Sequence, residues 1–304
     1  FIATVEAISY TGASPSFIDI EKNFYTISPE ALKDFIMRKT VFDRDKKLLV
    51  NRQSRRLIKA IIPVHLYGQS ADLEPILEIA HEYELKVIED CAQSHLASYH
   101  GKKVGTWGDI GCFSFYPSKN LGAFGEGGAL VTDDPEKALK VRMLRDHGQK
   151  QKHYHEIVGY NYRMDGFQGA ILNVKLRHLS DWNDKRRDLA SLYKSCLKDI
   201  PYLILPEERE GSLHIYHLYV VRVKEREAAI KWLDANGVGT GIHYPFPIHT
   251  TGAYLKLGYK EGDFPVSEEC AREVLSLPMF PELEKSEAEY VAKCLKEYFS
   301  NEKK

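Results

Sequence analysis

The chain has 304 residues, of which 43% are hydrophobic and 28% are charged, and its 42 basic and 43 acidic side chains leave a formal net charge of -1 at pH 7. This balance gives no electrostatic reason to expect nucleic acid or a membrane as a partner. No apolar run approaches the roughly 20 residues that a membrane-spanning helix needs, and no signal peptide is visible. Five scattered cysteines without a C-x-x-C pair are typical of reduced thiols, so we predict a cytoplasmic protein.

The first residues, FIATVEAI, are apolar and compatible with a helix, but no N-cap residue or initiator methionine precedes Phe1. We therefore expect that the natural N-terminal segment is missing from this chain. From residue 59 onward the pattern alternates between strands and helices. It predicts strands at 59–68, 85–92, 108–116 and 127–133, and helices at 71–84 and 135–148. Apolar strands separated by helices predict an α/β fold with a mostly parallel sheet flanked by helices.

The pattern changes after about residue 165. Residues 165–200 predict one or two long helices with an apolar stripe made by Phe167, Ile171, Val174, Leu179 and Trp182. The remainder predicts a strand at 217–223, helices at 226–237, 267–278 and 285–300, and a proline-rich loop at 243–254. Because the chain is long for one compact domain, we predict a large domain at 1–180 and a smaller C-terminal α+β domain at 181–304.

Residues 114–130, SFYPSKNLGAFGEGGAL, hold a single lysine, Lys119, next to aromatic residues. Lys119, Ser114 and Asp90 all fall near the ends of predicted strands, where ligands bind in open α/β sheets. A lysine among aromatic rings is poorly solvated as an ammonium, so its pKa falls and the neutral amine can attack a carbonyl. Each residue also has an ordinary interpretation, as a surface lysine, a turn or a helix cap.

This set suits pyridoxal phosphate, which needs a lysine for a Schiff base, a carboxylate for its pyridine nitrogen and a cradle for its phosphate. Asp90 is the candidate for the ring nitrogen, Gln93 for the ring hydroxyl oxygen, and Ser114 with backbone N–H groups for the phosphate. The glycines of GEGG, after Lys119, are expected to let the backbone approach the cofactor closely. We expect no metal site, because His153-Tyr154-His155 lacks a carboxylate and cysteine set nearby.

Four stretches occur in order: VIEDCAQSHLA, GDIGCFSFYPSKNLGAFGEGGALVTDD, GYNYRMDGFQGAIL and IHYPFPIH. Together they resemble the DegT/DnrJ/EryC1/StrS family of pyridoxal-phosphate-dependent sugar aminotransferases, which have fold type I, the aspartate aminotransferase fold. The resemblance runs from FIATVEAI to SLPMFPEL. It implies that Lys119 forms the Schiff base with the cofactor and moves the proton between cofactor and substrate carbons, and that Asp90 pairs with the pyridinium nitrogen.

The resemblance also implies a homodimer with shared active sites, because Asn161 matches a residue that reaches the phosphate of the neighbouring subunit's cofactor. Phe1 matches an aromatic ring that stacks on the pyridine. Candidate substrate-binding residues are Arg163, His243, Tyr244 and His249. For each of these histidines, a structural hydrogen bond is the ordinary alternative.

The predicted reaction is a ping-pong transamination from L-glutamate to a keto group of a nucleotide-linked deoxysugar. Two alternatives stay open. Sugar dehydratases of this family carry histidine in place of the Schiff-base lysine, which the presence of Lys119 disfavours. A catalytically inert or regulatory homologue agrees with the absence, from these residues, of the G-T-x-A-L-like turn that supplies phosphate donors in the family.

Overall fold

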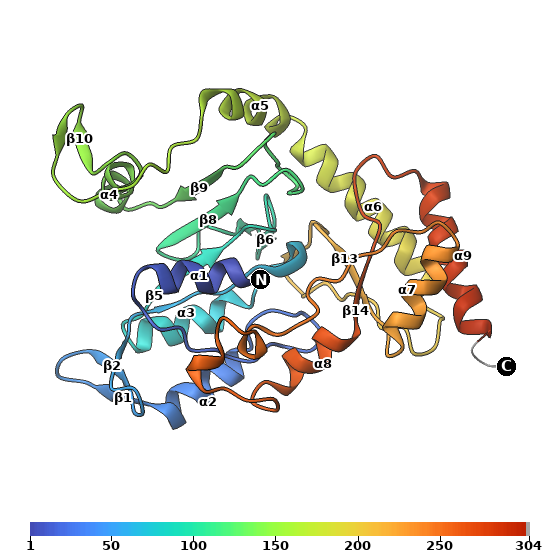
Figure 1. Ribbon diagram of the computed structural model, residues 1–304, viewed down its shortest axis with the longest axis horizontal. Helices are drawn as coiled ribbons and strands as arrows, with labels where there is room; N and C mark the ends of the chain where they lie inside the picture. The colour runs from blue at the N-terminus through green and yellow to red at the C-terminus, as the bar shows by residue number, and fades with distance from the viewer. Residues whose placement is uncertain (302–304) are drawn as a thin grey trace.

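The structure is a computed structural model, and it describes residues 1–301 (Figure 1). Its central sheet has four strands in the order β4 (Ala60–Ile61), β5 (Lys86–Asp90), β8 (Ile110–Ser114) and β9 (Gly128–Val131). The first three strands are parallel, and β9 is antiparallel to β8. This arrangement confirms the prediction of a mostly parallel central sheet. It also brings the carboxyl ends of β5 and β8 to the same edge.

Helices of the N-terminal half pack beside this sheet. They are α1 (Ile2–Tyr10), α2 (Pro29–Lys39) and α3 (Leu73–Glu82). The α2 and α3 helices contact each other and share a buried apolar cluster with β5. The start of α2 follows from local sequence, because the Ser28 side chain accepts a hydrogen bond from the backbone N–H of Ala31 and a proline occupies the first turn.

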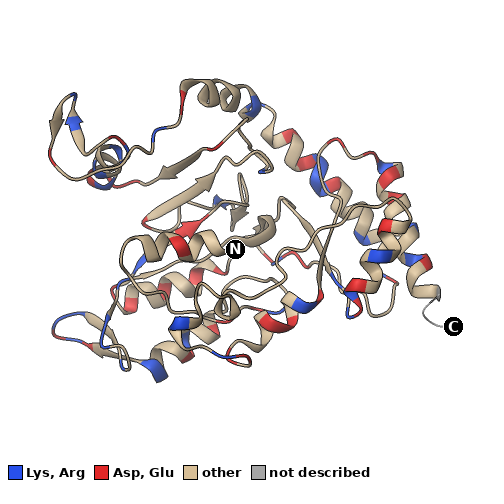
Figure 2. Ribbon diagram, in the orientation of Figure 1, with Lys and Arg blue, Asp and Glu red and all other residues tan. Residues whose placement is uncertain are grey.

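The C-terminal half has a core of its own, built on the antiparallel pair β13 (Tyr219–Arg222) and β14 (Val274–Leu277). Three helices surround this pair: α6 (Leu179–Leu197), α7 (Arg226–Ala235) and α9 (Lys285–Asn301). The α7 and α9 helices lie together at the right of Figure 1. Figure 2 shows both signs of charge interspersed over these outer helices, in agreement with the near-neutral total.

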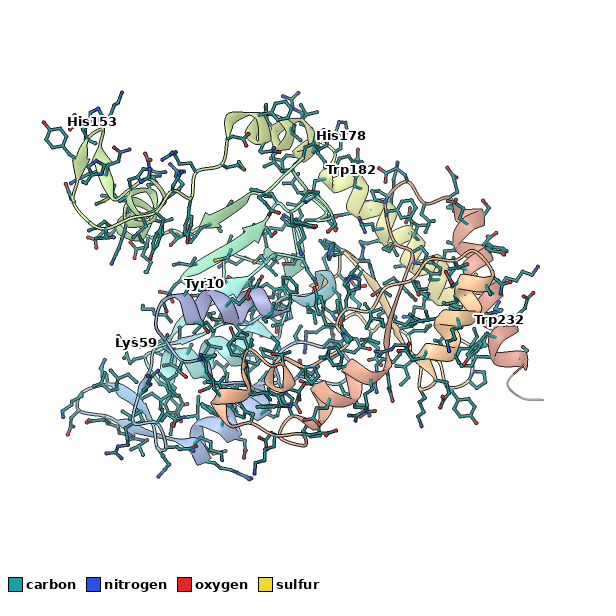
Figure 3. The ribbon with its side chains drawn as sticks, viewed as in Figure 1. Tyr10, Lys59, His153, His178, Trp182 and Trp232 are labelled. Atoms are coloured by element: carbon teal, nitrogen blue, oxygen red, sulfur yellow. The ribbon has the colours of Figure 1, made fainter. Side chains whose placement is uncertain are left out.

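An arm, defined here as residues 147–165, projects at the opposite end of the molecule (Figure 1). It follows α4 (Pro135–Arg145) and contains the short hairpin of β10 (Gln149–Gln151) and β11 (Tyr154–His155). His153 lies at the tip of this hairpin (Figure 3). Backbone hydrogen bonds from Gly148, Tyr160 and Tyr162 join the arm to α4, but most of its side chains are exposed.

Smaller elements complete the described part of the chain. Two minor antiparallel sheets were not expected from the sequence, and they consist of β1 (Thr40–Asp43), β2 (Leu48–Asn51) and β3 (Leu57–Ile58), and of β6 (Ser98–Tyr99), β7 (Lys102–Lys103) and β12 (Ser212–Leu213). The remaining helices are α5 (Gly166–Leu176) and α8 (Pro265–Glu273), with 3-10 turns at Leu66–Gly68, Ile248–Thr250 and Leu255–Leu257. Within residues 1–301, no helix is long and apolar enough to cross a bilayer.

Most predicted elements of the central sheet are confirmed, but two expectations about the later helices are wrong. The helix expected at 267–278 ends at Glu273, because the next four residues are fully buried and pair with β13 as β14. The expected apolar stripe does not lie on one buried face, since Leu179 is 1% exposed but Phe167 and Val174 are 69% and 58% exposed. The division of the chain at residue 180 stays a prediction.

Candidate functional site

Lys119 lies in a tight loop between β8 and β9. Its backbone N–H donates to the Tyr116 carbonyl at 2.9 Å, and the loop closes where the Ala123 N–H donates to the Phe115 carbonyl at 2.7 Å. Gly122 is required for this closure, because a Cβ there would approach the Pro117 carbonyl oxygen to 2.3 Å. The loop therefore holds the lysine at a defined position beyond the end of β8.

The side chain of Lys119 is half-buried, and its surroundings favour the neutral amine. Burial lowers the pKa of Lys119, and the nearby Asp90 carboxylate opposes that shift only in part. The expected aromatic niche is different in the structure. The rings of Phe113 and Phe115 pack on His95, with centroids 5.5 and 6.0 Å away, and Tyr116 is largely exposed. Loss of solvation therefore comes from general burial rather than from a cage of phenyl rings.

Asp90 ends β5 on the same edge of the sheet. Its Oδ2 accepts a hydrogen bond from the Thr4 hydroxyl at 2.6 Å, and its Oδ1 accepts one from the Ala92 N–H at 3.0 Å. These two bonds orient the carboxylate and leave acceptor capacity for a further donor. Our sequence reasoning missed Thr4, although it lies one helical turn after the predicted stacking residue, Phe1, on α1.

Gln93 links three parts of the site. Its Oε1 accepts the backbone N–H of Tyr67 at 2.7 Å, and its Nε2 donates to the Tyr244 hydroxyl at 3.2 Å. The ring of Tyr244 in turn lies 5.2 Å from the ring of Phe1. The structure thus brings Phe1, Gln93 and Tyr244 together, although they come from distant segments of the chain.

The two candidate histidines of the proline-rich loop have different surroundings. His243 is hydrogen-bonded through Nδ1 to the Ser276 hydroxyl at 2.8 Å, and burial, followed by the Lys119 charge, lowers its pKa. His249 is buried against Glu268, with 3.0 Å between its Nε2 and a carboxylate oxygen. Glu268 also accepts the backbone N–H groups of Gly262 and Phe264, which precede its helix. His243 therefore borders the Lys119 site, whereas His249 is engaged within the protein.

Asn161 and Arg163 lie on the exposed arm. The backbone of Asn161 forms a bridge with Asp146, and Nη1 of Arg163 donates to the Asp146 carboxylate at 2.6 Å. Within residues 1–301, neither side chain is hydrogen-bonded to Lys119, Asp90 or Gln93. Whatever these two residues bind, this chain's own lysine is not among their contacts.

Glu89, next to Asp90, is completely buried and saturated with donors. It accepts bonds from His65 Nε2 at 3.0 Å and from the backbone N–H groups of Gly105, Trp107 and Gly108 at 2.6–2.8 Å. Its closeness to His65 and Cys91 resembles a metal-ligand group. The four hydrogen bonds to Glu89, and the Ala71 N–H bound to His65 Nδ1 at 3.0 Å, already occupy the ligand atoms of Glu89 and His65.

Pyridoxal phosphate, the cofactor expected from the sequence, fits this donor set. The site offers an amine of lowered pKa, a carboxylate with a free lone pair and, at the end of β8, the hydroxyl of Ser114, which accepts a 3.3 Å bond from the Tyr116 N–H. One expectation needs correction. The glycines of GEGG meet protein atoms, since a Cβ at Gly127 would approach Met164 Sδ to 2.8 Å.

A cavity of about 1370 Å³ borders the site on the side of Phe1, Thr4 and Tyr244. Its other walls are mostly apolar and come from α1, α2 and the segments 13–20 and 56–62. Neither Lys119 nor Asp90 lines it. We therefore do not assign this cavity to a phosphate or a sugar, which need polar partners.

Comparison with known proteins identifies relatives over nearly the whole chain. The model of the DegT/DnrJ/EryC1/StrS aminotransferase family matches residues 1–296. The chain is 42% identical to the "Pleiotropic regulatory protein" of Geobacillus stearothermophilus, over 98% of this chain and 76% of that protein. It is 40% identical to the dTDP-3-amino-3,4,6-trideoxy-alpha-D-glucose transaminase of Streptomyces venezuelae, over 98% of this chain and 74% of that protein.

A solved structure agrees with this result. The crystal structure of S. venezuelae DesV in complex with a ketimine intermediate superposes with a TM-score of 0.90 at 39% identity, covering 98% of this chain and 76% of that chain. The agreement in fold and sequence covers every element that builds the site described above.

Proposed function

The chain belongs to the DegT/DnrJ/EryC1/StrS aminotransferase family and is a pyridoxal-phosphate-dependent sugar aminotransferase; from this premise we propose that it moves an amino group from L-glutamate to a keto group of a nucleotide-linked deoxysugar. The observation that carries the proposal is the half-buried Lys119, whose pKa is lowered beside the Asp90 carboxylate. When bound, the cofactor supplies an aldehyde carbon that condenses with amines and a ring that accepts electrons. We place this reaction in the cytoplasm, where the five free cysteines would remain reduced.

Each residue of the site has a proposed task. Lys119 covalently holds the cofactor and, once released, carries the proton between carbon atoms, because a neutral amine can accept it and an ammonium can return it. Asp90, oriented by Thr4, keeps the ring nitrogen protonated. Gln93 has one amide hydrogen left for the ring hydroxyl oxygen, and Ser114 contributes a hydroxyl to the phosphate.

The aromatic and loop residues enclose the space in which the reaction takes place. Phe1 offers a flat ring for the pyridine face. Tyr244 and His243 border the space from the proline-rich loop, where they are placed to contact substrate hydroxyls. We keep His249 and Arg163 as proposed substrate residues, although His249 is buried in this chain and Arg163 lies on the arm.

The amino donor is tested directly. Protein loaded with the cofactor is mixed with single L-amino acids, and the 2-oxo acid released is measured by mass spectrometry. We expect release from L-glutamate and none from the Lys119→Ala variant. Release from another amino acid but not from L-glutamate would refute the donor and leave the transaminase activity standing.

The acceptor is tested with a panel of keto sugars, each free or linked to dTDP or UDP. We expect the loaded, glutamate-treated protein to aminate a nucleotide-linked keto sugar and to leave the free sugar unchanged. The relatives named as dTDP- and UDP-sugar aminotransferases support this expectation. Amination of free sugars alone would overturn it.

We also propose that the functional unit is a homodimer in which the arm covers a second copy. The arm exposes a set of large apolar side chains, among them Val158 at 92%, and the stacked rings of Tyr160 and Tyr162, 4.8 Å apart. Exposed apolar clusters of this kind favour a partner surface. In such a dimer, Asn161 of one copy contacts the phosphate of the cofactor held by the other.

Mixing experiments test the shared site. Lys119→Ala and Asn161→Ala variants are each expected to be inactive, and a refolded mixture of the two is expected to regain activity because some mixed dimers contain one intact site. Light scattering gives the oligomeric state. A mixture that stays inactive while it is dimeric would show that each copy builds its own site.

A regulatory role is the second candidate, because one close relative is named a regulatory protein. The two candidates differ in what they require of Lys119. A regulator that only binds the cofactor retains its regulatory effect when the glutamate reaction is absent. Failure of every donor in the experiment above, with the cofactor still bound at Lys119, would favour this candidate.

A further inference from the structure

Tyr67 lies where several segments of the chain meet beside the site. Its backbone N–H donates to Oε1 of Gln93 at 2.7 Å, and its hydroxyl donates to the backbone carbonyl of His243. Its own carbonyl accepts the N–H of Leu218 at 3.3 Å. The ring is 5% exposed and packs edge-to-face on the ring of Tyr25, with 5.5 Å between the centroids. Each polar group of Tyr67 is therefore engaged by a different segment.

The backbone of Tyr67 has a conformation that a tyrosine rarely adopts. Its φ of 60° and ψ of 1° lie in the left-handed region, which is unfavourable for a residue with a Cβ. The next residue, Gly68, has a φ of 107° and no room for a side chain, because a Cβ there would approach the backbone nitrogen of His217 to 2.9 Å. The Gly68 carbonyl accepts the N–H of Ile215 at 3.0 Å. Residues persist in such conformations when their surroundings fix them, so the segment before β13 holds this turn in one geometry.

The contact with Tyr67 determines which way the Gln93 amide faces. A backbone N–H can only donate, so the Gln93 atom that faces Tyr67 must be the oxygen. The oxygen and nitrogen of this amide therefore cannot be interchanged. Nε2 of Gln93 then faces the Tyr244 hydroxyl at 3.2 Å and donates to its oxygen. Each group keeps one hydrogen, an N–H of Gln93 and the O–H of Tyr244, for another acceptor.

The hydroxyl of Tyr67 acts on the loop that carries Tyr244. Burial raises the pKa of Tyr67 well above its ordinary value, so its hydroxyl stays protonated and donates to the His243 carbonyl. The His243 ring is held separately, by the 2.8 Å hydrogen bond between its Nδ1 and the Ser276 hydroxyl. His243 is thus fixed at both its carbonyl and its ring, and the next residue along the chain is Tyr244.

We propose that Tyr67 is a positioning residue of the site: its backbone N–H sets the direction of the Gln93 amide, and its hydroxyl fixes the loop that presents Tyr244. The two hydrogens that result, on Gln93 Nε2 and on the Tyr244 hydroxyl, suit two neighbouring acceptor oxygens. The inference rests on the proposed function, in which Gln93 faces the ring hydroxyl oxygen of the cofactor and Tyr244 contacts the substrate. Tyr67 acts only through these two residues.

The hydroxyl bond is tested first in the wild-type protein, without cofactor or substrate. Tyrosines labelled with ¹³C and ¹⁵N are observed in an equal mixture of H₂O and D₂O, where a hydroxyl that exchanges slowly gives two ¹³Cζ signals. The Tyr67 signals are assigned through Gly68, because the pair Tyr-Gly occurs once in the sequence. We expect two ¹³Cζ signals for Tyr67, since its hydroxyl is buried and donates. One averaged signal would overturn the proposal.

The effect on the loop is tested with Tyr67→Phe, which removes the hydroxyl and keeps the ring and the backbone N–H. We expect the ¹³Cζ signal of Tyr244, assigned as the one missing from Tyr244→Phe, to shift because its loop has lost the anchor at His243. Tyr25→Phe is the matched control, since it removes a hydroxyl from the neighbouring ring of the same apolar cluster and should leave the Tyr244 signal in place. An unchanged Tyr244 signal in the folded Tyr67→Phe variant, or an equal shift in the control, would refute the positioning role.

Two substitutions of Gln93 test the amide contact, and they keep the design decisive if Tyr67→Phe does not fold. Gln93→Glu retains an acceptor oxygen for the Tyr67 N–H, whereas Gln93→Leu removes it. We expect the amide proton signal of Tyr67 to move upfield only in Gln93→Leu, because an amide proton without an acceptor is more shielded. No movement in Gln93→Leu, or the same movement in both variants, would overturn the proposal.

Kinetics separate positioning from a general effect on stability. In Tyr67→Phe we expect KM for the acceptor sugar to rise about tenfold, the size of one net hydrogen bond, while kcat stays within about twofold. Tyr25→Phe should change neither constant, and an equal rise of KM in both variants would refute the positioning role. If the wild-type protein aminates no sugar while the three spectroscopic results are as expected, the proposed function fails and the anchoring of Gln93 and the loop by Tyr67 stands.

Discussion

The two faces of strand β5 carry neighbouring carboxylates in opposite situations. Glu89 is completely buried and receives four hydrogen bonds, one from His65 and three from backbone N–H groups. Asp90, on the other face, receives two bonds, from Thr4 and Ala92, and lies within the field of Lys119. Because side chains alternate along a strand, adjacent residues can serve separate environments.

This contrast teaches that hydrogen-bond saturation, more than residue type, separates a structural carboxylate from a reactive one. Burial alone would raise the pKa of Glu89, but the bonds from His65, Gly108 and Gly105 hold it below its ordinary value. The Glu89 carboxylate therefore serves to hold together the chain segments that pack on its face of β5. Asp90 keeps acceptor capacity, so it is available to a bound group.

The largest expected effect is on the Asp90 face. Replacing Lys119 by alanine should lower glutamate turnover by at least about a thousandfold, because it removes both the covalent anchor and the proton carrier. The midpoint of thermal unfolding should stay near that of the wild type, since a half-buried amine of lowered pKa stabilises the fold little. Turnover of the Lys119→Ala variant within tenfold of the wild type would show that the reactive groups do not lie on the Asp90 face of β5.

On the Glu89 face the expected effect is on stability. Glu89→Gln should lower the free energy of unfolding by about 3 kcal/mol, because the amide places N–H hydrogens against backbone N–H donors and leaves His65 without its carboxylate. Urea unfolding measures this change. Glu84→Gln, at an exposed ion pair with Lys47, is the control and should leave the free energy of unfolding nearly unchanged, because water screens that pair.

Asp90→Asn should show the reverse pattern from Glu89→Gln. We expect turnover about a hundredfold lower, because a neutral amide no longer holds the proton on the ring nitrogen. The free energy of unfolding should change by less than about 1 kcal/mol, since the amide oxygen can still accept from Thr4. If the Asp90→Asn variant is unstable yet fully active per folded molecule, Asp90 stabilises the fold, as Glu89 does, and has no part in the reaction.

Low pH affects the buried histidines and Glu89 differently, because the histidines are neutral in the folded protein and Glu89 is charged. His95 and His214 are buried, and their pKa values fall to about 4 and about 3, chiefly through burial. Between about pH 6.5 and 4 the unfolded chain therefore binds more protons than the folded chain, so stability falls as the pH falls, by about 1.4 kcal/mol per pH unit for each histidine. Glu89, whose pKa is lowered, keeps its full contribution above its ordinary value of 4.5 and loses it only as the pH falls further.

Urea unfolding at pH 7, 6 and 5 checks this slope. The His214→Phe variant should show a smaller slope than the wild type, because one buried neutral imidazole is gone. The exposed His153 provides the control, since His153→Gln should leave the slope unchanged. Equal slopes in all three proteins would show that the buried histidines are not the source of acid sensitivity.

Much of the central sheet could be predicted from the sequence. Strands β5, β8 and β9 and helices α3 and α4 follow from local apolar patterns and from caps such as Asp134 and Pro135. The β14 strand could not, because its helix-compatible sequence becomes a strand only when β13 supplies the pairing edge. The exposed stripe on α5 has the same cause, since periodicity shows which residues share a face and not whether anything covers it.

The sequence by itself determined the chemistry: an isolated lysine after a strand, a carboxylate at the end of another, and motifs in the order of a known family. Tertiary structure decided which neighbours those groups meet. Thr4 lies 86 residues from Asp90, and Asn183 lies 88 residues from His95. Hydrogen-bond partners and burial depend on segments that only folding brings together, so no local pattern could separate Asp90 from Glu89.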